Sequence, residues 1–327
     1  MVVETEPVVV LLSLVDGVRL PPTPKRRGRP DVYAERLIVK GLLVMVVHQV
    51  WTAHGLLALL AEPTAKMARV RAHLCEQTGQ LPSRRTWERR LDRLATVLPL
   101  LIALLGRWLL TRLDPWPQGG RAVAIDSTVL GARGGVWHKK HRDAGVVPHT
   151  SIDTEAGWTK SGWHGWVYGW KLHLLVTGSE YVWLPLAADL TPANVADNEH
   201  ASLLVADLPE EVSAVLGDMQ YNDPVLAVLV EGQGRLLITT KRGAYPHTDA
   251  GVEVRRVFHQ LRSHAIENFN GQFKAIFGCL DKVPTRGLIA TRLFALGAVL
   301  LYQLTLWHRA IAERDLRQGI KPFLLSA

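Results

Sequence analysis

Three acidic residues have the types and positions that metal-dependent chemistry requires. Asp126 ends the apolar segment 121–126, and Asp218 ends a second apolar segment, 213–218. If these segments are neighbouring strands of one sheet, both carboxylates emerge at the same edge, close enough to share divalent cations. Glu267 lies in a long helical segment and, packed across the sheet, would supply a third carboxylate. Carboxylate oxygens are the hard ligands that Mg²⁺ prefers, so the three acids are candidate metal ligands.

The elements that must position these acids follow one another in an informative order. After residues 114–120, rich in Pro and Gly, the hydrophobic period changes from the helical to the strand type. The predicted order from there is β-β-β-α-β-α-β-α, with an antiparallel meander first and a packing helix last. This is the order of a ribonuclease-H-like core, an α/β fold whose mixed sheet is flanked by helices, and it places strands one and four side by side. The predicted strands are 121–126, 169–177, 180–188, 213–218 and 235–240, and the predicted helices are 194–208, 224–232, 257–277 and 288–314.

The segment between Asp126 and Lys171 has no period that assigns a structure, although it is rich in Gly, Trp and His. His138 and His141 have a spacing found in zinc sites, but no second pair lies nearby, which favours a solvated loop. The tryptophans of this segment indicate packing, with base stacking as the alternative.

Positive charge is concentrated in the front of the chain. Residues 1–120 contain 17 Lys and Arg against 10 Asp and Glu, whereas residues 121–327 contain 21 against 20. Proteins that neutralise phosphates release the counterions of nucleic acid, which drives binding without sequence contacts. We therefore expect DNA to bind the front. The composition, 48% hydrophobic and 21% charged, excludes disordered and collagen-like chains.

Residues 1–30 are predicted to be a basic tail, because the prolines and charges of residues 21–30 cannot build a core. Within this run, Arg27-Gly28-Arg29-Pro30 resembles the core of an AT-hook, in which arginines lie in the narrow minor groove of A·T-rich DNA. A solvated basic tail is the alternative. The candidate DNA contacts in the run are Arg26, Arg27 and Arg29.

Residues 31–120 are predicted to be a helical DNA-binding region. Apolar residues recur there at helical spacing, with breaks at 62–64 and 79–83. Ser83 is a candidate N-cap for a helix whose first two turns carry arginines. A turn containing Gly79 before that helix fits a helix-turn-helix, whose second helix enters the major groove; an arginine-rich surface helix is the alternative. The candidate contacts are Arg84, Arg85 and Arg89.

Short motifs along most of the chain, from Gly28-Arg29-Pro30 to Phe277, match the pattern of one family. In this order and at these separations, they make the chain resemble the insertion-sequence transposases of the DDE class found in bacteria and archaea. The main motifs are Ala124–Thr128, Tyr168–His173, Leu190–Asn198, Gly217–Tyr221 and Ile266–Phe269.

The resemblance implies phosphoryl transfer on double-stranded DNA, with cleavage at the element's ends and joining of those ends to target DNA. It implies two Mg²⁺ or Mn²⁺ ions per active site, which activate the attacking hydroxyl and stabilise the leaving oxygen. Asp126 would bridge both ions, and Asp218 and Glu267 would hold one each. Residues 121–327 would be the catalytic domain, and the protein would act as a homodimer or higher assembly on DNA.

Other residues near the triad have more specialised predicted roles. Lys274 follows Glu267 by two helical turns on the same face and is a candidate phosphate ligand. The family's fuller signature has a tyrosine and an arginine seven and four positions before the glutamate, where this chain has Gln260 and Ser263. Arg262 is one position before that of the family's arginine and is expected to point away from the Glu267 face. This difference argues against assigning to this chain the hairpin or base-flipping step of relatives that have the full signature.

Lys171 and His173 alternate with apolar residues on one predicted strand and therefore share a face. They are either DNA contacts or residues of a solvated sheet face.

The core admits two rival functions: a nuclease that cuts without joining, and a non-enzymatic DNA-binding protein, which the intact triad disfavours. Cys75 and Cys279 have neither disulfide nor zinc-ribbon spacing. This indicates a reducing compartment, the bacterial or archaeal cytoplasm, with the protein on the nucleoid. Charges and a proline interrupt the longest apolar segments, which predicts buried helices and no membrane partner.

Overall fold

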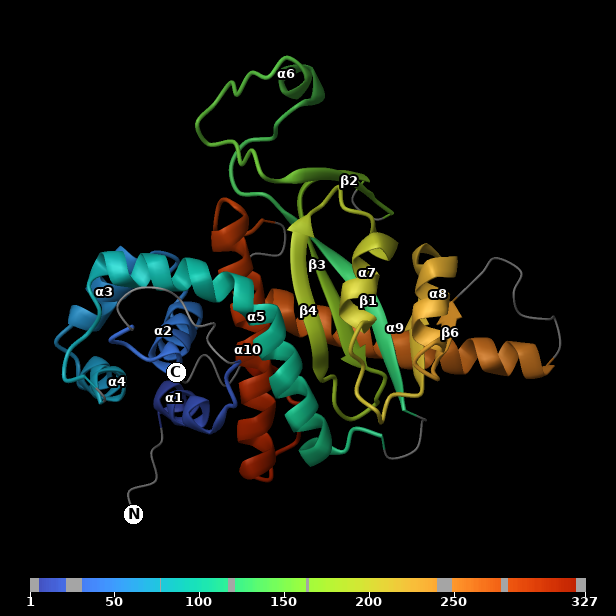
Figure 1. The fold of residues 1–327 in the computed structure, drawn as a ribbon, viewed down its shortest axis with the longest axis horizontal. Coiled ribbons are helices and arrows are strands. Elements are labelled where there is room, and N and C mark those ends of the chain that lie inside the picture. Colours follow the sequence, from blue (N-terminus) through green and yellow to red (C-terminus); the bar gives the residue numbers. More distant parts are fainter. Residues whose placement is uncertain are drawn as a thin grey trace.

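In the residues that it describes, the computed structural model has a mixed six-stranded sheet with helices on both faces (Figure 1). The strand order is β2-β3-β1-β5-β6, and β4 also pairs with β3. The structure describes residues 6–21, 31–76, 78–116, 121–162, 165–239, 249–277 and 282–321. The strands are β1 (Ala122–Gly131), β2 (Gly157–Ser161), β3 (Gly165–Thr177), β4 (Pro185–Pro192), β5 (Ala214–Gly217) and β6 (Leu236–Thr239).

The register around β1 confirms the predicted ribonuclease-H-like order. β1 is antiparallel to β3 along its length, from Val123 opposite Thr177 to Gly131 opposite Gly169. It is parallel to β5 only over residues 122–124. The first and fourth strands of the predicted core, β1 and β5, are therefore neighbours, and β1 continues beyond the point where β5 ends.

Helices cover both faces of the sheet. α7 and α9 contact β1 from opposite faces, and α8 packs beside β6 (Figure 1). β2 and a short helix, α6, were not predicted, because the glycines and tryptophans around them have no clear hydrophobic period. The helices of this half are α6 (Lys139–Asp143), α7 (Asp197–Val205), α8 (Pro224–Glu231), α9 (Asp249–Phe277) and the 3₁₀ turn η1 (Met219–Tyr221).

The helical front and the sheet share one hydrophobic core. α5 packs on β4, and the last helix, α10, packs against α1, α2, α5 and β4. One continuous cluster of buried apolar residues runs through these elements. The predicted boundary near residue 120 therefore does not separate two cores. The remaining helices are α1 (Pro7–Gly17), α2 (Glu35–Val47), α3 (Ala53–Ala61), α4 (Ala65–Cys75), α5 (Arg84–Leu113) and α10 (Leu288–Ile311).

The prediction that residues 1–30 form a tail was wrong for the first half of that segment. Val8, Val9, Leu11 and Leu12 of α1 are almost completely buried. These side chains contribute a helix to the core, and the prolines that suggested a tail begin only after it. The run that contains Arg26, Arg27 and Arg29 lies outside the described residues.

α5 and α10 have the length and hydropathy of membrane-spanning helices. Their apolar character has an explanation within the fold, because the two helices pack against each other and against β4. Their long apolar faces thus build the centre of the core. A buried amide secures the junction, since the Gln303 side chain of α10 donates to the carbonyl oxygens of Ile102, at 2.9 Å, and Pro185, at 2.8 Å.

A close contact between α5 and β4 predicts a destabilising effect of one added methyl group at Gly106. A Cβ on Gly106 would lie 2.7 Å from the carbonyl oxygen of Pro185 and 3.1 Å from Cα of Leu186, both backbone atoms. We expect Gly106→Ala to lower the free energy of unfolding by about 1 to 3 kcal/mol, as overpacking does. Urea unfolding would measure it.

Gly271 of α9 provides the matched control, because a Cβ there would meet no atom within 4 Å. Gly271→Ala should therefore stabilise the helix by about 0.5 to 1 kcal/mol. Equal effects of the two substitutions would show that α5 and β4 are not in close contact.

Candidate active site

Asp126 and Asp218 lie at the same edge of the sheet. Asp126 is on β1 just beyond the residues that pair with β5, so the edge of β1 that faces β5 is open there. Asp218 directly follows β5 and caps η1, its Oδ1 accepting a hydrogen bond from the Gln220 backbone at 2.8 Å. The structure thus brings these two carboxylates together as the strand order requires, and their catalytic role stays a prediction.

Arg262 of α9 bridges the two carboxylates. Its Nη2 lies 2.7 Å from Oδ2 of Asp126 and 3.8 Å from Oδ2 of Asp218. Sequence reasoning placed Arg262 away from the face of Glu267, and the structure agrees. The sequence did not reveal, however, that the face of α9 with Arg262 is the one that packs on the sheet.

The structure does not bring Glu267 to the two aspartates. Arg262, Ala265, Phe269 and Phe273 recur every three or four residues on the face of α9 that packs inward. Glu267 lies two residues from both Ala265 and Phe269, which is about 200° around the helix, and its side chain is exposed. Among the described residues no group of three or more Asp, Glu, His or Cys side chains is arranged to hold a metal ion. The expected three-carboxylate cluster is therefore reduced to a pair in this arrangement.

The electrostatics of the pair reflect partial burial of like charges. Burial raises the pKa of Asp126 to about 6, and Arg262 and the Ser127 backbone N–H oppose this rise. Asp218 adds to the rise through repulsion between the two carboxylates. Asp126 is therefore a partly buried acid whose charge depends on a nearby cation.

Tyr221 is a member of this site that sequence reasoning did not assign. Its side chain is buried, and its hydroxyl has no hydrogen-bond partner in the described structure. Burial raises its pKa well above the usual value, and the charges of Asp126, Asp197 and Asp218 raise it further. The signal was present in the Gly-Asp-x-x-Tyr motif, where Tyr221 follows Asp218 by three residues.

Lys171 and His173 do share a face, but the expectation that this face meets DNA or solvent was wrong. Both side chains are buried. Nζ of Lys171 lies 3.2 Å from Oδ2 of Asp197, and Nε2 of His173 lies 2.8 Å from the hydroxyl of Thr191. The physical reason is that α7, which begins at Asp197, covers this part of β3.

This buried polar cluster continues to β4 and α10. Asp189 of β4 lies 3.1 Å from Nε2 of His200 and also pairs with Arg292. Although burial raises the pKa of Asp189, its bonds to His200 and Arg292 hold it below the usual value. Burial and then the neighbouring His200 ring lower the pKa of His173, so His173 is neutral at neutral pH.

The predicted DNA-binding arginines of the front lie on the surface. Arg84, Arg85 and Arg89 are exposed, and Ser83 caps α5 by accepting a hydrogen bond from the Thr86 backbone. The connection 76–83 between α4 and α5 is longer than the turn of about three to four residues in a helix-turn-helix. The structure therefore supports the predicted cap but not the tight turn, and DNA contact by these arginines stays a prediction.

Lys274 lies in the last turn of α9 and is partly exposed. Its predicted role toward phosphate stays a prediction.

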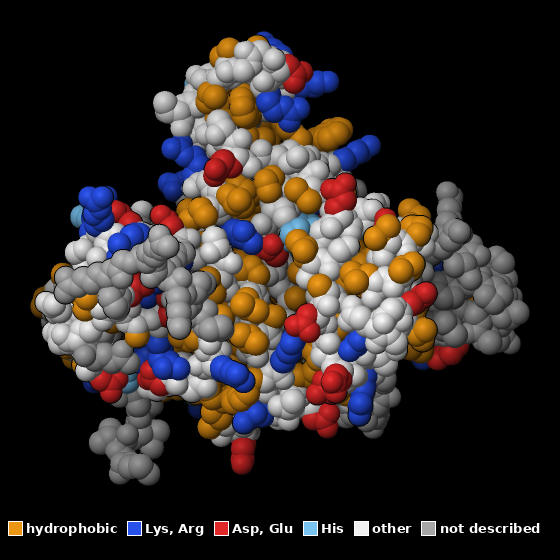
Figure 2. All heavy atoms as spheres, in the orientation of Figure 1, with side chains coloured by type: hydrophobic (Ala, Val, Ile, Leu, Met, Phe, Trp, Pro, Cys, Tyr) orange, Lys and Arg blue, Asp and Glu red, His pale blue; other side chains and the backbone are white. Residues whose placement is uncertain are grey.

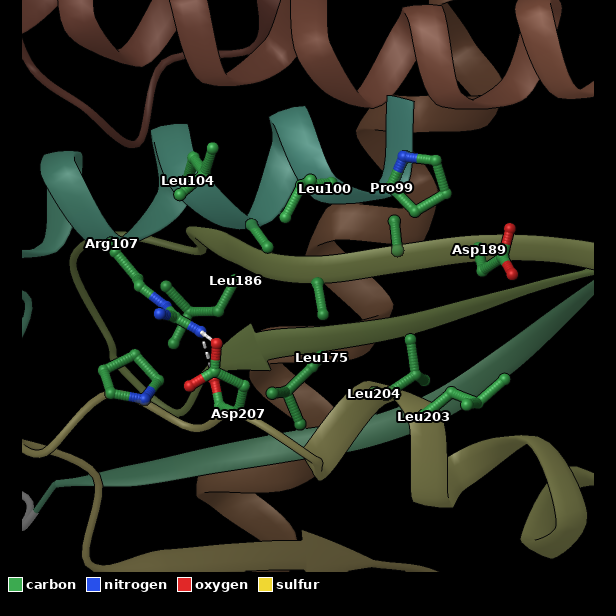
Figure 3. A pocket seen from close by; sticks show the side chains of 14 residues that line it. Pro99, Leu100, Leu104, Arg107, Leu175, Leu186, Asp189, Leu203, Leu204 and Asp207 are labelled. Atoms are coloured by element: carbon green, nitrogen blue, oxygen red, sulfur yellow. Dashed lines mark hydrogen bonds and ion pairs between the residues drawn. The ribbon is translucent and has the colours of Figure 1, made fainter. Parts of the chain in front are cut away.

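A pocket of about 230 Å³ between α5, β4 and α7 is not a second active site (Figure 3). Most of its lining is aliphatic. Arg107 and Asp207 pair with each other across it, and Asp189 is engaged by His200 and Arg292. The pocket therefore offers no uncommitted charged group for chemistry.

The strand order defines a ribonuclease-H-like fold. The family model described as "Transposase DDE domain" matches residues 117–304, more than half of the chain. The chain belongs to this family of transposases. The matched range includes both aspartates, Glu267 and most of α10.

Comparison with solved structures gives only weak likenesses. A piggyBac transposase synaptic complex with hairpin DNA is 10% identical, with a TM-score of 0.41, over 98% of this chain and 76% of that one. A Mos1 transposase paired-end complex with the left transposon end is 12% identical, with a TM-score of 0.23, over 90% and 82%. No curated protein matches the chain in sequence.

The raised pKa of Asp126 predicts a pH-dependent stability. The usual pKa of this carboxyl is 3.8, and in the fold it is about 6. Below about pH 4 the Asp126 carboxyl is protonated in both the folded and the unfolded state. Between about pH 4 and 6 it ionises in the unfolded chain but stays largely protonated in the fold. The free energy of unfolding therefore falls through this window, by about 2 to 3 kcal/mol in all. We expect Asp126→Asn to gain stability relative to the wild type as the pH rises through this window. Urea unfolding in EDTA would measure the difference.

Asp92→Asn, a change at an exposed carboxylate of α5, controls for the substitution itself. A difference between wild type and Asp126→Asn that stayed constant with pH would contradict the raised pKa.

Proposed function

We propose that this chain is a transposase that cleaves DNA at the ends of an insertion sequence and joins those ends to target DNA by metal-dependent phosphoryl transfer. The family supports the general class. One geometric observation supports the reaction: two carboxylates, one within β1 just beyond its pairing with β5 and one directly after β5, already share a single cation, Arg262.

The donor set at this edge fits a divalent metal ion. Asp126 and Asp218 supply oxygen ligands of the type that Mg²⁺ and Mn²⁺ prefer. The guanidinium of Arg262 already provides positive charge between them. The hydroxyl of Tyr221, which has no hydrogen-bond partner in the described structure, lies near the same carboxylates. Bound metal would supply Lewis-acid stabilisation of the transferring phosphate and activation of the attacking hydroxyl.

The chain's own residues have distinct parts in this proposal. Asp126 and Asp218 hold the metal. Arg262, once it leaves the carboxylates, presents a planar fork of N–H donors that suits phosphate oxygens. Glu267 is the family's third acid, and it would reach the pair only after α9 turns about its axis.

DNA is the proposed substrate because of the charge distribution. The exposed arginines at the start of α5 and the basic run 22–30 provide positive charge in the front half. A nuclease without strand transfer remains the alternative, and the two differ in their products. The proposed assembly on DNA is a homodimer or a larger complex.

The role of Asp218 can be tested against a neighbouring aspartate. Asp223 caps α8 and accepts hydrogen bonds from the backbones of Val225 and Leu226; asparagine caps helices equally well. We expect Asp218→Asn to lose at least about 100-fold in Mg²⁺-dependent cleavage, by analogy with the effects of disturbed metal sites. Asp223→Asn should remain close to wild type, and both should bind DNA.

The substrate for this test is a plasmid carrying the chain's own gene with its flanking DNA. Cleavage at the element's ends followed by joined products supports a transposase, and cleavage without joining supports the nuclease. Wild-type rates for Asp218→Asn would exclude Asp218 as a ligand.

Competition between Arg262 and metal gives a second test that needs no DNA. Because Arg262 must leave before both carboxylates are free, Arg262→Met should bind Mn²⁺ about ten-fold more tightly, equivalent to about 1.4 kcal/mol. Isothermal titration calorimetry would measure it. Arg256→Met is the control, since Arg256 lies on the same helix but pairs with Glu253. Equal Mn²⁺ affinities for all three proteins would place the metal elsewhere.

A further inference from the structure

Residues 132–156, here called the arm, leave the end of β1 and return at β2. In Figure 1 the arm, with α6 at its tip, projects beyond the sheet and away from the helical front. α6 has no buried residue. The arm therefore contributes little to the core, and its position calls for another explanation.

The arm is held at its base by specific hydrogen bonds. Arg133 donates to the carbonyl oxygen of Pro284 at 2.7 Å, and Arg286 donates to that of Thr150. Asp153 and Glu155 accept from the backbone N–H groups of residues 287 and 288, where α10 begins. The base is thus fixed to α10.

Hydrogen bonds from two indoles hold the arm, one within it and one from β2. Nε1 of Trp137 donates to the carbonyl oxygen of Val146 at 2.9 Å, and Nε1 of Trp158 donates to that of Trp137 at 2.9 Å. The arm therefore presents its tip in a defined orientation.

The tip carries positive charge that the fold does not use. Lys139, Lys140 and Arg142 are exposed. In the described part of the chain, neither lysine pairs with a carboxylate, and Arg142 has only its neighbour Asp143, at 4.0 Å. Figure 2 shows Lys and Arg side chains, in blue, on the projection.

An exposed aromatic side chain lies on the hairpin next to the arm. Trp166 of β3 is 68% exposed and is paired in register with Lys160 of β2, which is also exposed. Trp166 meets Trp158 edge-on, with ring centroids 6.5 Å apart. A lysine and a tryptophan side by side on an exposed strand pair can contact a phosphate and a sugar or base together.

We propose that the tip of the arm and the β2–β3 hairpin form a surface that grips duplex DNA beside the paired acids. This rests on the proposed function, because it assigns a surface for the same substrate. β1 runs directly from Asp126 to Gly131, about 17 Å, so DNA positioned at the acids extends to the arm within one helical turn. Lysine is depleted at protein–protein interfaces, which disfavours a second copy of the chain as the occupant.

The proposal is tested with the full chain and a fluorescent mixed-sequence duplex, by anisotropy over a range of salt concentrations in EDTA. The triple variant Lys139→Ala, Lys140→Ala and Arg142→Ala should bind about ten-fold more weakly at low salt. The slope of log affinity against log salt should be shallower by about 2 to 3, one increment for each phosphate that the arm no longer neutralises. Trp166→Ala should weaken binding without changing the slope, because it removes no charge.

The control removes the same charge at the opposite end of α10. Arg314, Arg317 and Lys321 are exposed and follow a helix of 24 residues that begins at the base of the arm, so they lie roughly 36 Å away. Their triple alanine variant should keep the wild-type slope. All of these side chains are exposed, so the melting temperatures of the variants should match that of the wild type.

Three results would overturn the proposal. The arm variant could match the control in slope and affinity, or it could change the sedimentation coefficient and leave the slope unchanged, which would make the arm a contact between copies. A wild-type chain that binds no duplex would remove the proposed DNA partner as well. Failure of the proposed reaction is distinguishable, because it would abolish Mg²⁺-dependent cleavage while leaving the binding difference between arm variant and control intact.

Discussion

Two carboxylates cannot share a partly buried sheet edge without positive charge between them. β1 extends beyond the end of β5, and this single feature of the register leaves Asp126 and Asp218 at the same open edge of the sheet. Repulsion and desolvation would otherwise protonate one of them, and burial raises the pKa of Asp126 to about 6 even with Arg262 beside it. Arg262 supplies this positive charge in the structure, and in the proposed reaction a divalent cation would supply it. The need for a cation follows from the fold rather than from any one ligand.

The position of Arg262 depends in turn on aromatic packing far from the acids. Phe269 and Phe273 of α9 stack with centroids 6.1 Å apart. Phe269 meets Tyr302 of α10 edge-on at 5.0 Å, and Phe273 meets Phe294 at 6.5 Å. These contacts set the rotation of α9 about its axis, and that rotation decides whether Arg262 or Glu267 faces the sheet. Because α10 also packs on α1, α2 and α5, the helical front supports the site without lining it.

Sequence reasoning was most successful where a local pattern decided the structure. The strands beside Asp126 and Asp218 were predictable because short apolar runs lead to each acid, and the strand order followed from the order of elements. The predicted end of the first strand at Asp126 was wrong, because β1 continues to Gly131. The spacing of apolar residues also indicated which face of α9 packs inward. The prediction that Glu267 joins the aspartates followed the family pattern instead of that spacing. For Lys171, alternation gave the shared face correctly and could not show that α7 covers it. The arm was not predictable, since long-range hydrogen bonds rather than a hydrophobic period hold it.

The two aspartates are supported in different ways. Asp126 belongs to a strand whose backbone is paired on both sides before the edge opens. Asp218 sits on η1, which has only three residues, so its position depends on its neighbours. Tyr221 anchors this turn in the core, and Asn198 of α7 donates to Asp223 at 3.0 Å, which links α7 to the cap of α8 just beyond the turn. α7 is itself fixed to β3 by the buried Lys171 and Asp197 pair. The buried pair of Lys171 and Asp197 therefore helps to determine where the second carboxylate lies, through α7 and the 3₁₀ turn.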